Sequence, residues 1–499
     1  MSDNSKHTSP VRGWTTKQIA NFVAASTGND TPISLVWNWQ KRTEDLEKGD
    51  LRRFPESIGH DEKGQAVYNP LEVVTWLRTN KEIDTGDGPS AEFWYLADQL
   101  RGRAISNKEM ERILSFFIDE KVRPTAGHYK SHPDLVITSN DTQMQFEVKL
   151  QRSVKQLDRA ARRHLLEEIQ RFFLADRFNA EFHTPPRLAS LAARLLDARP
   201  GSRVFDPCAG SGRLLAAVAD QCNEPRLIEL VGQELNELTA HLGDAMIAVT
   251  EAAKGSRVLQ GDSLTFNPAF VGFADYVIAH YPLRTKIDPK RFRSSGSDPR
   301  FAYMKPTTAG DVAWVQILLS ALKPTGGRAV VIGSLFTTSH RQSDKLRETL
   351  LRRRHVEAVI RLAKDQRAYG NGLPPTIIIL DTDPEQAFRR KKVLFVDVAL
   401  TKDETQAKSA DDFVVALVKA FRAGSLEDKA EHPHVTWRAA HDQEIAAADY
   451  VLAPSHYIGQ TTERVDPKQL EERLRSLSKQ LAETRRQLEE LQTKRKNLQ

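Results

Sequence analysis

Residues 204–215, with the sequence VFDPCAGSGRLL, decide the fold of this chain. The apolar residues before Asp206 predict a short buried strand, and the apolar run after Gly212 predicts the first turns of a helix. Gly210 and Gly212 let the backbone bend sharply and approach a ligand closely, because no Cβ obstructs it. Open α/β sheets bind ligands at the carboxyl ends of their strands, where this turn is expected to lie. Such turns also carry glycines for packing alone, so the rest of the chain decides its meaning.

Three other short segments surround this stretch. Phe-His-Thr-Pro occupies residues 182–185, Gly-Gln-Glu ends an apolar run at 232–234, and Gly-Asp-Ser-Leu occupies 261–264. In order and spacing, the four segments resemble the motifs of the adenine-N6 DNA methyltransferases. The resemblance covers about residues 180–460 and is closest to the modification subunit of type I restriction systems. A generic Rossmann-like fold with another ligand is the alternative, and four spaced motifs argue against it.

The resemblance implies a Rossmann-like class I methyltransferase core that binds S-adenosylmethionine. In the family, the Asp-Pro-x-x-Gly-Ser-Gly motif wraps the methionine end of the cofactor, and the Thr-Pro segment closes over it. An acidic residue holds the ribose hydroxyls, and an Asp further on meets the adenine ring. The implied cofactor-binding residues of this chain are Thr184, Asp206, Pro207, Gly210, Gly212, Glu234 and Asp262.

The expected catalytic loop departs from the family. The family has Asn-Pro-Pro followed by Phe or Tyr, and this chain has His280, Tyr281, Pro282 and Leu283. In the family, the Asn oxygen and a proline carbonyl accept from the adenine amino group, and the aromatic ring stacks on the flipped base. His280 has no amide oxygen, although a neutral imidazole can accept one hydrogen bond. Leu283 has no ring, and Tyr281 would have to stack from a shifted position, so we expect cofactor binding with weak or absent transfer.

The region around these motifs alternates between apolar strand-like runs and helical patterns. Such alternation predicts a doubly wound α/β sheet within residues 181–400. The predicted strands are 203–206, 228–232, 257–260, 275–279, 328–332, 356–360 and 375–381.

Length and composition bound the protein class. At 499 residues the chain is long enough for several domains. Its formal net charge of +6 suits a nucleic-acid partner, which the resemblance makes double-stranded DNA. Two cysteines exclude a disulfide scaffold and favour a reducing compartment. No apolar run approaches the roughly 20 residues that span a bilayer, and the start lacks a signal peptide, so we expect a cytoplasmic protein without membrane contact.

Residues 1–85 form a candidate DNA-binding module. Two amphipathic helices are expected at 15–23 and 32–39, then strands at 53–55 and 66–68, then a helix from Asn69. This order is similar to the winged helix-turn-helix of excisionase and MerR-like proteins, which lay the second helix in the major groove. A small helical domain that only packs against the rest is the alternative.

A second activity is a hypothesis for the α+β domain expected at residues 90–180. Asp134, in an expected strand, and Glu147 with Lys149, in its expected partner, resemble the PD-(D/E)xK nuclease signature. Two carboxylates on adjacent strands can hold one Mg²⁺ at a phosphodiester, with the lysine beside it. The alternative is ordinary strand alternation, and the basic helix that follows is either a solvated face or a track for the DNA backbone.

The C-terminal part divides into an extension at 401–465 and a helix at 466–499. The extension contains an expected helix at 411–423. Leucines at spacings of three and four in the last segment predict a coiled-coil seam that pairs with a partner protein, such as a specificity or restriction subunit, or with a second copy. Packing back on the same chain is the alternative.

The favoured interpretation is an S-adenosylmethionine-dependent DNA adenine-N6 methyltransferase-like protein of a restriction-modification or phage-defence system. One alternative is a pseudo-methyltransferase that binds DNA and cofactor and recruits partners, with His280 a mere loop residue. Another is a nuclease regulated by S-adenosylmethionine, which would add Mg²⁺ as a second cofactor.

Overall fold

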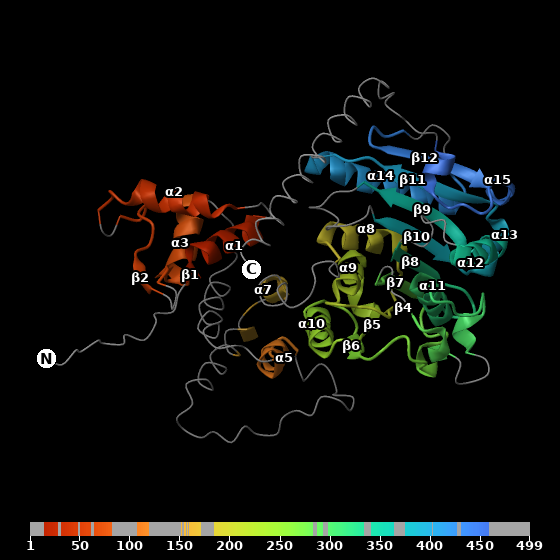
Figure 1. Ribbon diagram of the computed structural model, residues 1–499, viewed down its shortest axis with the longest axis horizontal. Helices are drawn as coiled ribbons and strands as arrows, with labels where there is room; N and C mark the ends of the chain where they lie inside the picture. The colour runs from red at the N-terminus through yellow and green to blue at the C-terminus, as the bar shows by residue number, and fades with distance from the viewer. Residues whose placement is uncertain are drawn as a thin grey trace, which may run out of the picture.

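A small N-terminal module and a larger α/β domain make up the computed structural model (Figure 1). The structure describes residues 14–27, 31–47, 50–60, 64–81, 107–118, 151, 154–155, 157, 159–170, 184–282, 287–292, 298–333, 341–363, 375–401, 403–426 and 431–458. Within these ranges, every helix is too short or too polar to cross a membrane.

The α/β domain is built on one sheet, nine-stranded within the described residues, with the order β12-β11-β9-β10-β8-β7-β4-β5-β6. The strands are β4 (Arg203–Asp206), β5 (Glu229–Glu234), β6 (Arg257–Gln260), β7 (Tyr276–His280), β8 (Arg328–Gly333), β9 (Val356–Leu362), β10 (Thr376–Asp381), β11 (Lys392–Val398) and β12 (Val435–His441). The seven predicted strands coincide with β4 to β10 within two residues. The sheet is mixed, because β10 runs antiparallel to β8 and β9, and β12 runs antiparallel to β11.

Helices cover both faces of this sheet (Figure 1). Both faces need cover because alternate residues of β8 are apolar on each side. Val330 and Ile332 belong to one apolar cluster, and Ala329 and Val331 belong to the other. A strand buried on both faces reads as a continuous apolar run. One layer consists of α8 (Pro186–Leu196), α9 (Arg213–Gln221), α10 (Glu237–Ala248) and α14 (Glu404–Ala423), and the other of α11 (Gly310–Ala321), α12 (Arg341–Arg352) and α15 (Asp442–Ala447). Two short helices, α13 (Pro384–Arg389) and α16 (Pro454–Tyr457), complete the domain.

The segment expected to be a separate extension contributes to the same domain. β12 pairs with β11 along its whole length, from Val435 to His441. Helix α14 begins earlier than expected, because the Asp403 side chain accepts hydrogen bonds from the backbone N–H groups of Thr405 and Gln406 at 2.8 and 3.1 Å. An aspartate in this position satisfies free N–H groups of the first turn.

The N-terminal module has the expected order of two helices, two strands and a helix, and one further short strand precedes them. It contains β1 (Trp14–Thr15), α1 (Thr16–Thr27), α2 (Ile33–Thr43), β2 (Ser57–His60), β3 (Ala66–Tyr68) and α3 (Pro70–Lys81), with the strand order β1-β3-β2. Two more helices, α5 (Asn107–Ser115) and α7 (Arg159–Ile169), lie beside the α/β domain (Figure 1). The assignment of the N-terminal module as a winged helix stays a prediction.

The expected strand at 53–55 is wrong, because the partner of β3 is β2, which starts at Ser57. Phe54 is instead a core residue at 5% exposure, with its ring centroid 4.9 Å from that of Trp76. Its backbone N–H donates to Thr43 Oγ1 at 2.9 Å, and Pro55 has no N–H to give to a ladder. Apolar content at this point reflected core packing rather than a strand.

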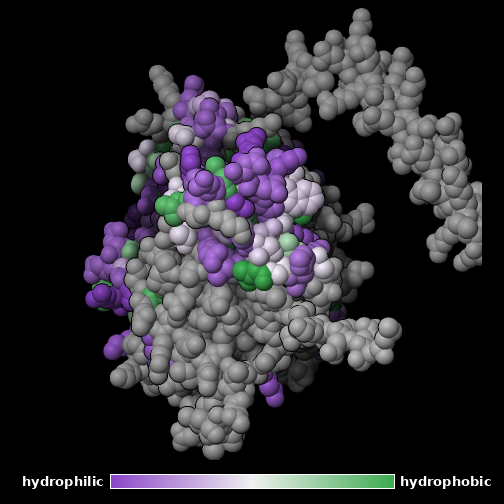
Figure 2. All heavy atoms as spheres, turned by 90° about the vertical axis from the view of Figure 1, so that its left-hand side faces the viewer, coloured by the Kyte–Doolittle hydropathy of each residue, from purple (hydrophilic) through white to green (hydrophobic). Residues whose placement is uncertain are grey.

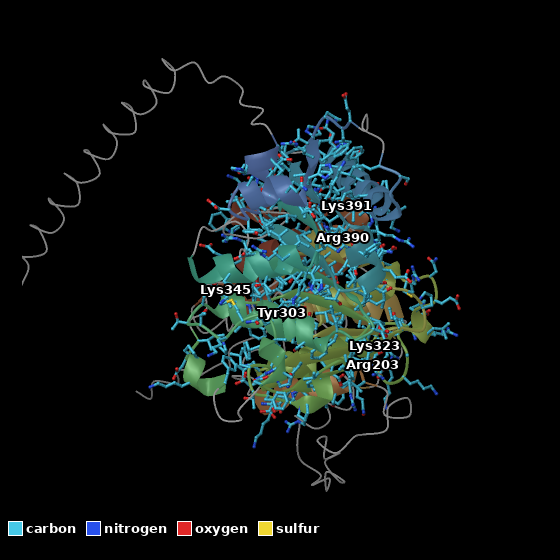
Figure 3. The ribbon with its side chains drawn as sticks, turned by 90° about the vertical axis from the view of Figure 1, so that its right-hand side faces the viewer. Arg203, Tyr303, Lys323, Lys345, Arg390 and Lys391 are labelled. Carbon is cyan, nitrogen blue, oxygen red and sulfur yellow. The ribbon has the colours of Figure 1, made fainter. Side chains whose placement is uncertain are left out.

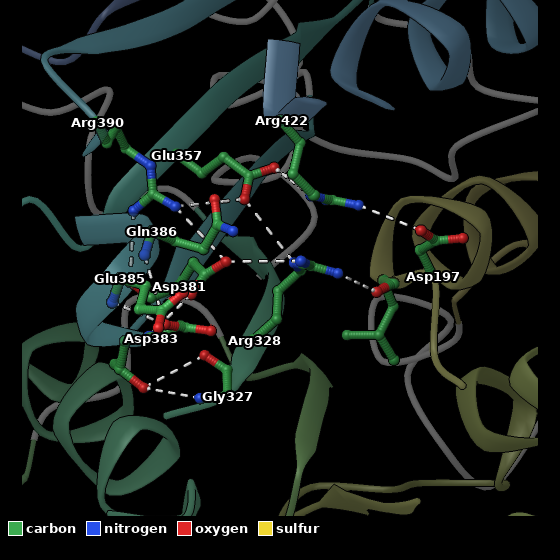
Figure 4. A network of polar contacts seen from close by, with 12 residues as sticks. Asp197, Gly327, Arg328, Glu357, Asp381, Asp383, Glu385, Gln386, Arg390 and Arg422 are labelled. Carbon is green, nitrogen blue, oxygen red and sulfur yellow. Dashed lines mark hydrogen bonds and ion pairs between the residues drawn. The ribbon is translucent and has the colours of Figure 1, made fainter. Parts of the chain in front are cut away.

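The amino end of the sheet holds a buried cluster of ions (Figure 4). Glu357 of β9 and Asp381 of β10 are 1% and 2% exposed. Arg422 of α14 donates to Glu357 at 2.8 Å, and it also pairs with Asp197 at the end of α8. The other ion pairs of the two carboxylates are made by Arg328 and Arg390. Because its members come from β8, β9, β10 and α14, the cluster ties together elements distant in the chain.

A second, more exposed set of charges lies at the same end of the sheet. Arg203 and Lys323 are neighbours there (Figure 3), and both contact Asp275. The Asp275 carboxylate accepts from the backbone N–H of Arg203 at 2.9 Å and pairs with the Lys323 ammonium at 2.5 Å. These contacts join the start of β4 to the turn before β8.

Candidate active site

Four of the predicted site residues meet at the opposite, carboxyl end of the sheet. Asp206 ends β4, Glu234 ends β5, Asp262 follows β6 and His280 ends β7, and these four strands are neighbours. The chain goes from β4 outward to β5 and β6 and then returns to the other side of β4 with β7. Ligands of open α/β sheets bind at such a reversal of strand order.

Asp206 is a fully buried carboxylate at the centre of this edge, with 0% exposure. Its Oδ1 accepts from the backbone N–H of Cys208 at 3.0 Å, and its Oδ2 has no partner among the described residues. Burial raises the pKa of Asp206 to about 7, and the nearby Glu234 adds to the rise. A buried acceptor without a partner is costly, so a donor or a cation supplied here would be bound favourably.

The two glycines after Asp206 shape the turn. Gly210 and Gly212 have φ angles of 53° and 73°, in the left-handed region that only glycine adopts freely. A Cβ on Gly212 would lie 2.8 Å from the backbone oxygen of Gly243, so α9 can start close to α10 only because residue 212 has none. At Gly210 a Cβ would meet nothing within 4 Å, which leaves open space beside the backbone.

Glu234 is held by the backbone on both sides. Its Oε2 accepts from the N–H of Gly210 at 3.1 Å, and its Oε1 accepts from the N–H of Asn236 at 2.9 Å. A carboxylate can accept about four hydrogen bonds, so capacity remains for a ligand. The next residue, Leu235, is 67% exposed and places an apolar side chain at the same edge.

The segment of Asp262 is fixed to its neighbours. The Asp262 carboxylate accepts from the backbone N–H of Leu264 at 2.9 Å. The Ser263 hydroxyl lies 2.5 Å from the carbonyl oxygen of Pro207 and 2.6 Å from Gln233 Oε1, which connects the ends of β4, β5 and β6. From the other side, the buried Arg300 donates to the carbonyl oxygens of residues 263 and 264.

His280 contacts the segment that precedes α8. Its Nδ1 lies 3.0 Å from Oγ1 of Thr184, so the two residues expected to flank the cofactor and the substrate are hydrogen-bonded to each other. Burial lowers the pKa of His280 to about 4, so the imidazole is neutral at pH 7. Which nitrogen accepts depends on the tautomer. If Nδ1 carries the proton and donates to Thr184, Nε2 is an acceptor for a substrate amino group.

Tyr281 points away from solvent. Its side chain is 1% exposed and belongs to the apolar cluster on the α11 side of the sheet. A Cβ on Gly333 of β8 would lie 2.4 Å from the Tyr281 hydroxyl oxygen, so the ring fills space that the glycine leaves. A ring buried there is not placed to stack on a base. Pro282 is partly buried, and Leu283 lies outside the described residues.

Known proteins share this sequence pattern and fold. The N-6 DNA Methylase family matches residues 167–466. The chain belongs to this family. The motif order at 182–264 predicted this family, and that prediction is confirmed.

Among curated proteins, this chain is similar to the type I restriction enzyme HindI methylase subunit of Haemophilus influenzae, at 23% identity over 87% of this chain and 98% of that one. It is also 26% identical to the type I restriction enzyme MjaVIII methylase subunit of Methanocaldococcus jannaschii, over 61% of this chain and 54% of that one. Among solved structures, the type I restriction-modification system methyltransferase subunit of Streptococcus thermophilus has a TM-score of 0.51 at 17% identity, covering 89% and 92% of the chains. A chain from the type I R-M system, solved to explain complex assembly and conformational transition, has a TM-score of 0.52 at 15% identity, covering 95% and 93%. These likenesses show the α/β methyltransferase fold.

The residues that resemble a nuclease signature, Asp134, Glu147 and Lys149, lie outside the described residues. Within the described ranges, there is no group of three or more His, Cys, Asp or Glu side chains that could hold a metal ion. The coiled coil expected at 466–499 also lies outside them. Both features stay predictions.

Two polar residues that hold the site were not found from sequence. Arg300 reaches carbonyl oxygens 36 and 37 positions away, and Gln170 reaches Ser211 41 positions away. No local pattern marks such contacts. Leu235 could have been found from the sequence. It directly follows the expected ribose-binding carboxylate at the end of a strand, where an apolar side chain need not be buried.

Proposed function

We propose that this protein is an S-adenosylmethionine-binding subunit for DNA modification in a type I restriction-modification system, and that its altered catalytic loop makes methyl transfer to adenine N6 weak. One observation carries the proposal. In a chain of the N-6 DNA Methylase family, the buried Asp206 carboxylate keeps an oxygen without a partner among the described residues. The relatives named as type I methylase subunits support the kind of system.

The residues at the carboxyl end of the sheet fit S-adenosylmethionine. Asp206, buried and without a described cation, is suited to the ammonium group of the methionine part. Glu234, oriented by two backbone N–H groups, is suited to the ribose hydroxyls, with Leu235 offering apolar surface beside it. Asp262, the third carboxylate at this edge, is assigned to the adenine. The open space at Gly210 lets a ligand approach the backbone. When bound, the cofactor supplies an electrophilic methyl group.

His280 is the residue best placed to meet a target amino group. Because it is neutral at pH 7, it adds no positive charge beside a sulfonium. It can accept from the amino group only through Nε2, in the tautomer whose Nδ1–H donates to Thr184. The usual amide oxygen is absent, and losing one such positioned group costs roughly 10²–10³ in rate. Since Tyr281 is buried, the base also loses stacking worth about 1–3 kcal/mol.

The N-terminal module is the proposed site of DNA contact. Helix α2 buries Val36 and Trp39. Its opposite face exposes Ser34, Asn38 and Lys41, together with Trp37 at 60% exposure. In Figure 2, which views the molecule from the side of this module, the described residues are mainly hydrophilic, with scattered apolar side chains among them. Polar, aromatic and basic groups on one exposed helix are suited to a groove of DNA.

Assembly with other subunits is part of the proposal. A chain of similar fold comes from a study of complex assembly in a type I R-M system. The C-terminal leucine pattern at 466–499 offers a helical seam for a specificity or restriction subunit.

A second candidate function is a pseudo-methyltransferase scaffold that binds DNA and cofactor without transfer. The buried ring of Tyr281 and the imidazole at position 280 favour it. A magnesium-dependent nuclease would rest on residues outside the described ranges, and nothing in the described part favours it.

Two measurements on the full chain test the proposal. Calorimetry with S-adenosylmethionine should detect binding that Asp206→Ala abolishes. Transfer of a labelled methyl group to DNA, with and without partner subunits, should be weak for the wild type. No binding to the wild type would refute the cofactor assignment, and fast transfer that His280→Ala leaves unchanged would refute the assignment of the catalytic loop.

The catalytic loop can also be restored in part. His280→Asn with Leu283→Phe should raise transfer, because the amide oxygen and the stacking ring return while Tyr281 keeps its place against Gly333. His355→Asn is a matched control, because burial likewise lowers the pKa of His355 to about 4, and it lies just before β9, at the amino end of the sheet. A scaffold that has lost other parts of the pocket would gain nothing from the double variant.

A further inference from the structure

The turn that carries Gly210 and Gly212 is braced by a residue from outside the sheet. Gln170 directly follows α7 and is 5% exposed. Its amide nitrogen donates to Ser211 Oγ at 3.0 Å, and its amide oxygen accepts from the Arg213 guanidinium at 2.9 Å. One side chain therefore bridges the two residues that flank Gly212. We propose that Gln170 is a positioning residue for the cofactor-binding turn.

The turn needs such a brace because of its glycines. Two glycines within three residues, both with positive φ, have more conformational freedom to lose than any other residue type. The N–H of Gly210 must stay aimed at Glu234, and α9 must start at Arg213. Because Gln170 holds residues 211 and 213 in place, fewer backbone conformations remain open to residue 212 between them. The bond to Ser211 joins two buried groups, so breaking it also leaves a buried polar atom unsatisfied.

Helix α7 is itself held firmly enough to act as the support. Leu165, Leu166 and Ile169 are 0–1% exposed. About two turns before Gln170, Arg163 of α7 pairs with Asp220 in the last turn of α9 at 2.5 Å. Helices α7 and α9 are therefore joined at both ends of α9, at the turn through Gln170 and Glu167, which both contact Arg213, and at the far end through Arg163. The two contacts provide a matched pair of variants.

The inference rests on the proposed cofactor function, and its first test is independent of the cofactor. Hydrogen exchange of the full chain without ligand is measured for the peptide covering residues 204–215. Gln170→Ala should speed exchange in this peptide, whereas Arg163→Ala should leave it unchanged and speed exchange near residue 220. Equal exchange at the turn in Gln170→Ala and wild type would overturn the proposal.

The second test measures affinity for S-adenosylmethionine by calorimetry. Gln170→Ala should weaken binding about tenfold, the effect of two net hydrogen bonds on one ordered turn. Adding Ser211→Ala to it should cost little more, because the two residues act through one bond. Gln170→Glu keeps an acceptor for Arg213 and can accept from the Ser211 hydroxyl, so it should bind more tightly than Gln170→Ala.

A purely structural role gives a different result. In that case Gln170→Ala would lower the unfolding temperature as Arg163→Ala does, with affinity within twofold of wild type, and the positioning role would be refuted. If the wild type binds no cofactor, the proposed function fails, while the exchange experiment still decides on Gln170.

Discussion

The two ends of the central sheet hold buried carboxylates in opposite electrostatic settings. At the amino end, Glu357 and Asp381 are surrounded by the guanidinium groups of Arg328, Arg390 and Arg422 (Figure 4). At the carboxyl end, Asp206 lies near Glu234, and neither pairs with a Lys or Arg of the described residues. The protein supplies its own cations to the carboxylates of the first site, and the second site has no such cation among the described residues, which is the difference between a structural ion cluster and a ligand site.

The largest expected effect is at the amino end. Glu357→Gln removes the negative charge that three arginines share. The arginines then stay buried with too little negative charge around them. Breaking a buried ion pair from one side typically destabilises by about 3–5 kcal/mol. Urea unfolding should show a loss of this size with unchanged cofactor affinity. A loss below about 1 kcal/mol would mean that the cluster contributes little to stability.

The same kind of substitution should raise the free energy of unfolding at the carboxyl end, where no cation of the described residues pairs with Asp206. Burial raises the pKa of Asp206 to about 7 in the folded protein, above the ordinary value of an aspartate, which is about 4. Stability is therefore lost as pH rises from about 4 to about 7, where the unfolded chain ionises first. Asp206→Asn should stabilise the free protein by about 4 kcal/mol at pH 7.5 and by nothing well below pH 4, and abolish cofactor binding. Thermal unfolding at the two pH values checks the sign. Destabilisation at pH 7.5 would show that the carboxylate is satisfied in the free protein.

The smallest effect is the pH dependence of cofactor affinity. A cationic ligand needs the ionised form of Asp206, so below pH 7 binding must release a proton. Affinity for S-adenosylmethionine should rise about tenfold between pH 6.0 and pH 7.5 and then level off. His280, with a pKa of about 4, does not titrate in this range. Calorimetry in buffers of different ionisation enthalpy measures the proton directly, and a flat profile without proton release would contradict the assigned pKa.

Local patterns made much of this site predictable. The strands β4 to β10 follow from apolar runs that need no knowledge of their neighbours. Asp206, Glu234, Asp262 and His280 each follow or end such a run, so alignment of the strands is enough to bring them to one edge. The misassigned strand at 53–55 marks the limit, because Phe54 packs on Trp76 of a later helix and apolar content alone cannot reveal that.

The sequence by itself determined the family, the positions of seven strands along the chain and the chemical groups offered at the carboxyl edge, because these depend on residue type and short-range spacing. Only the tertiary structure decided which of these groups are satisfied. The pKa of Asp206, the bond between His280 and Thr184, the burial of Tyr281 against Gly333 and the brace from Gln170 all depend on atoms 41 to 96 residues away or on burial. Desolvation and hydrogen-bond pairing are properties of the packed surroundings, and packing joins residues that no local pattern connects.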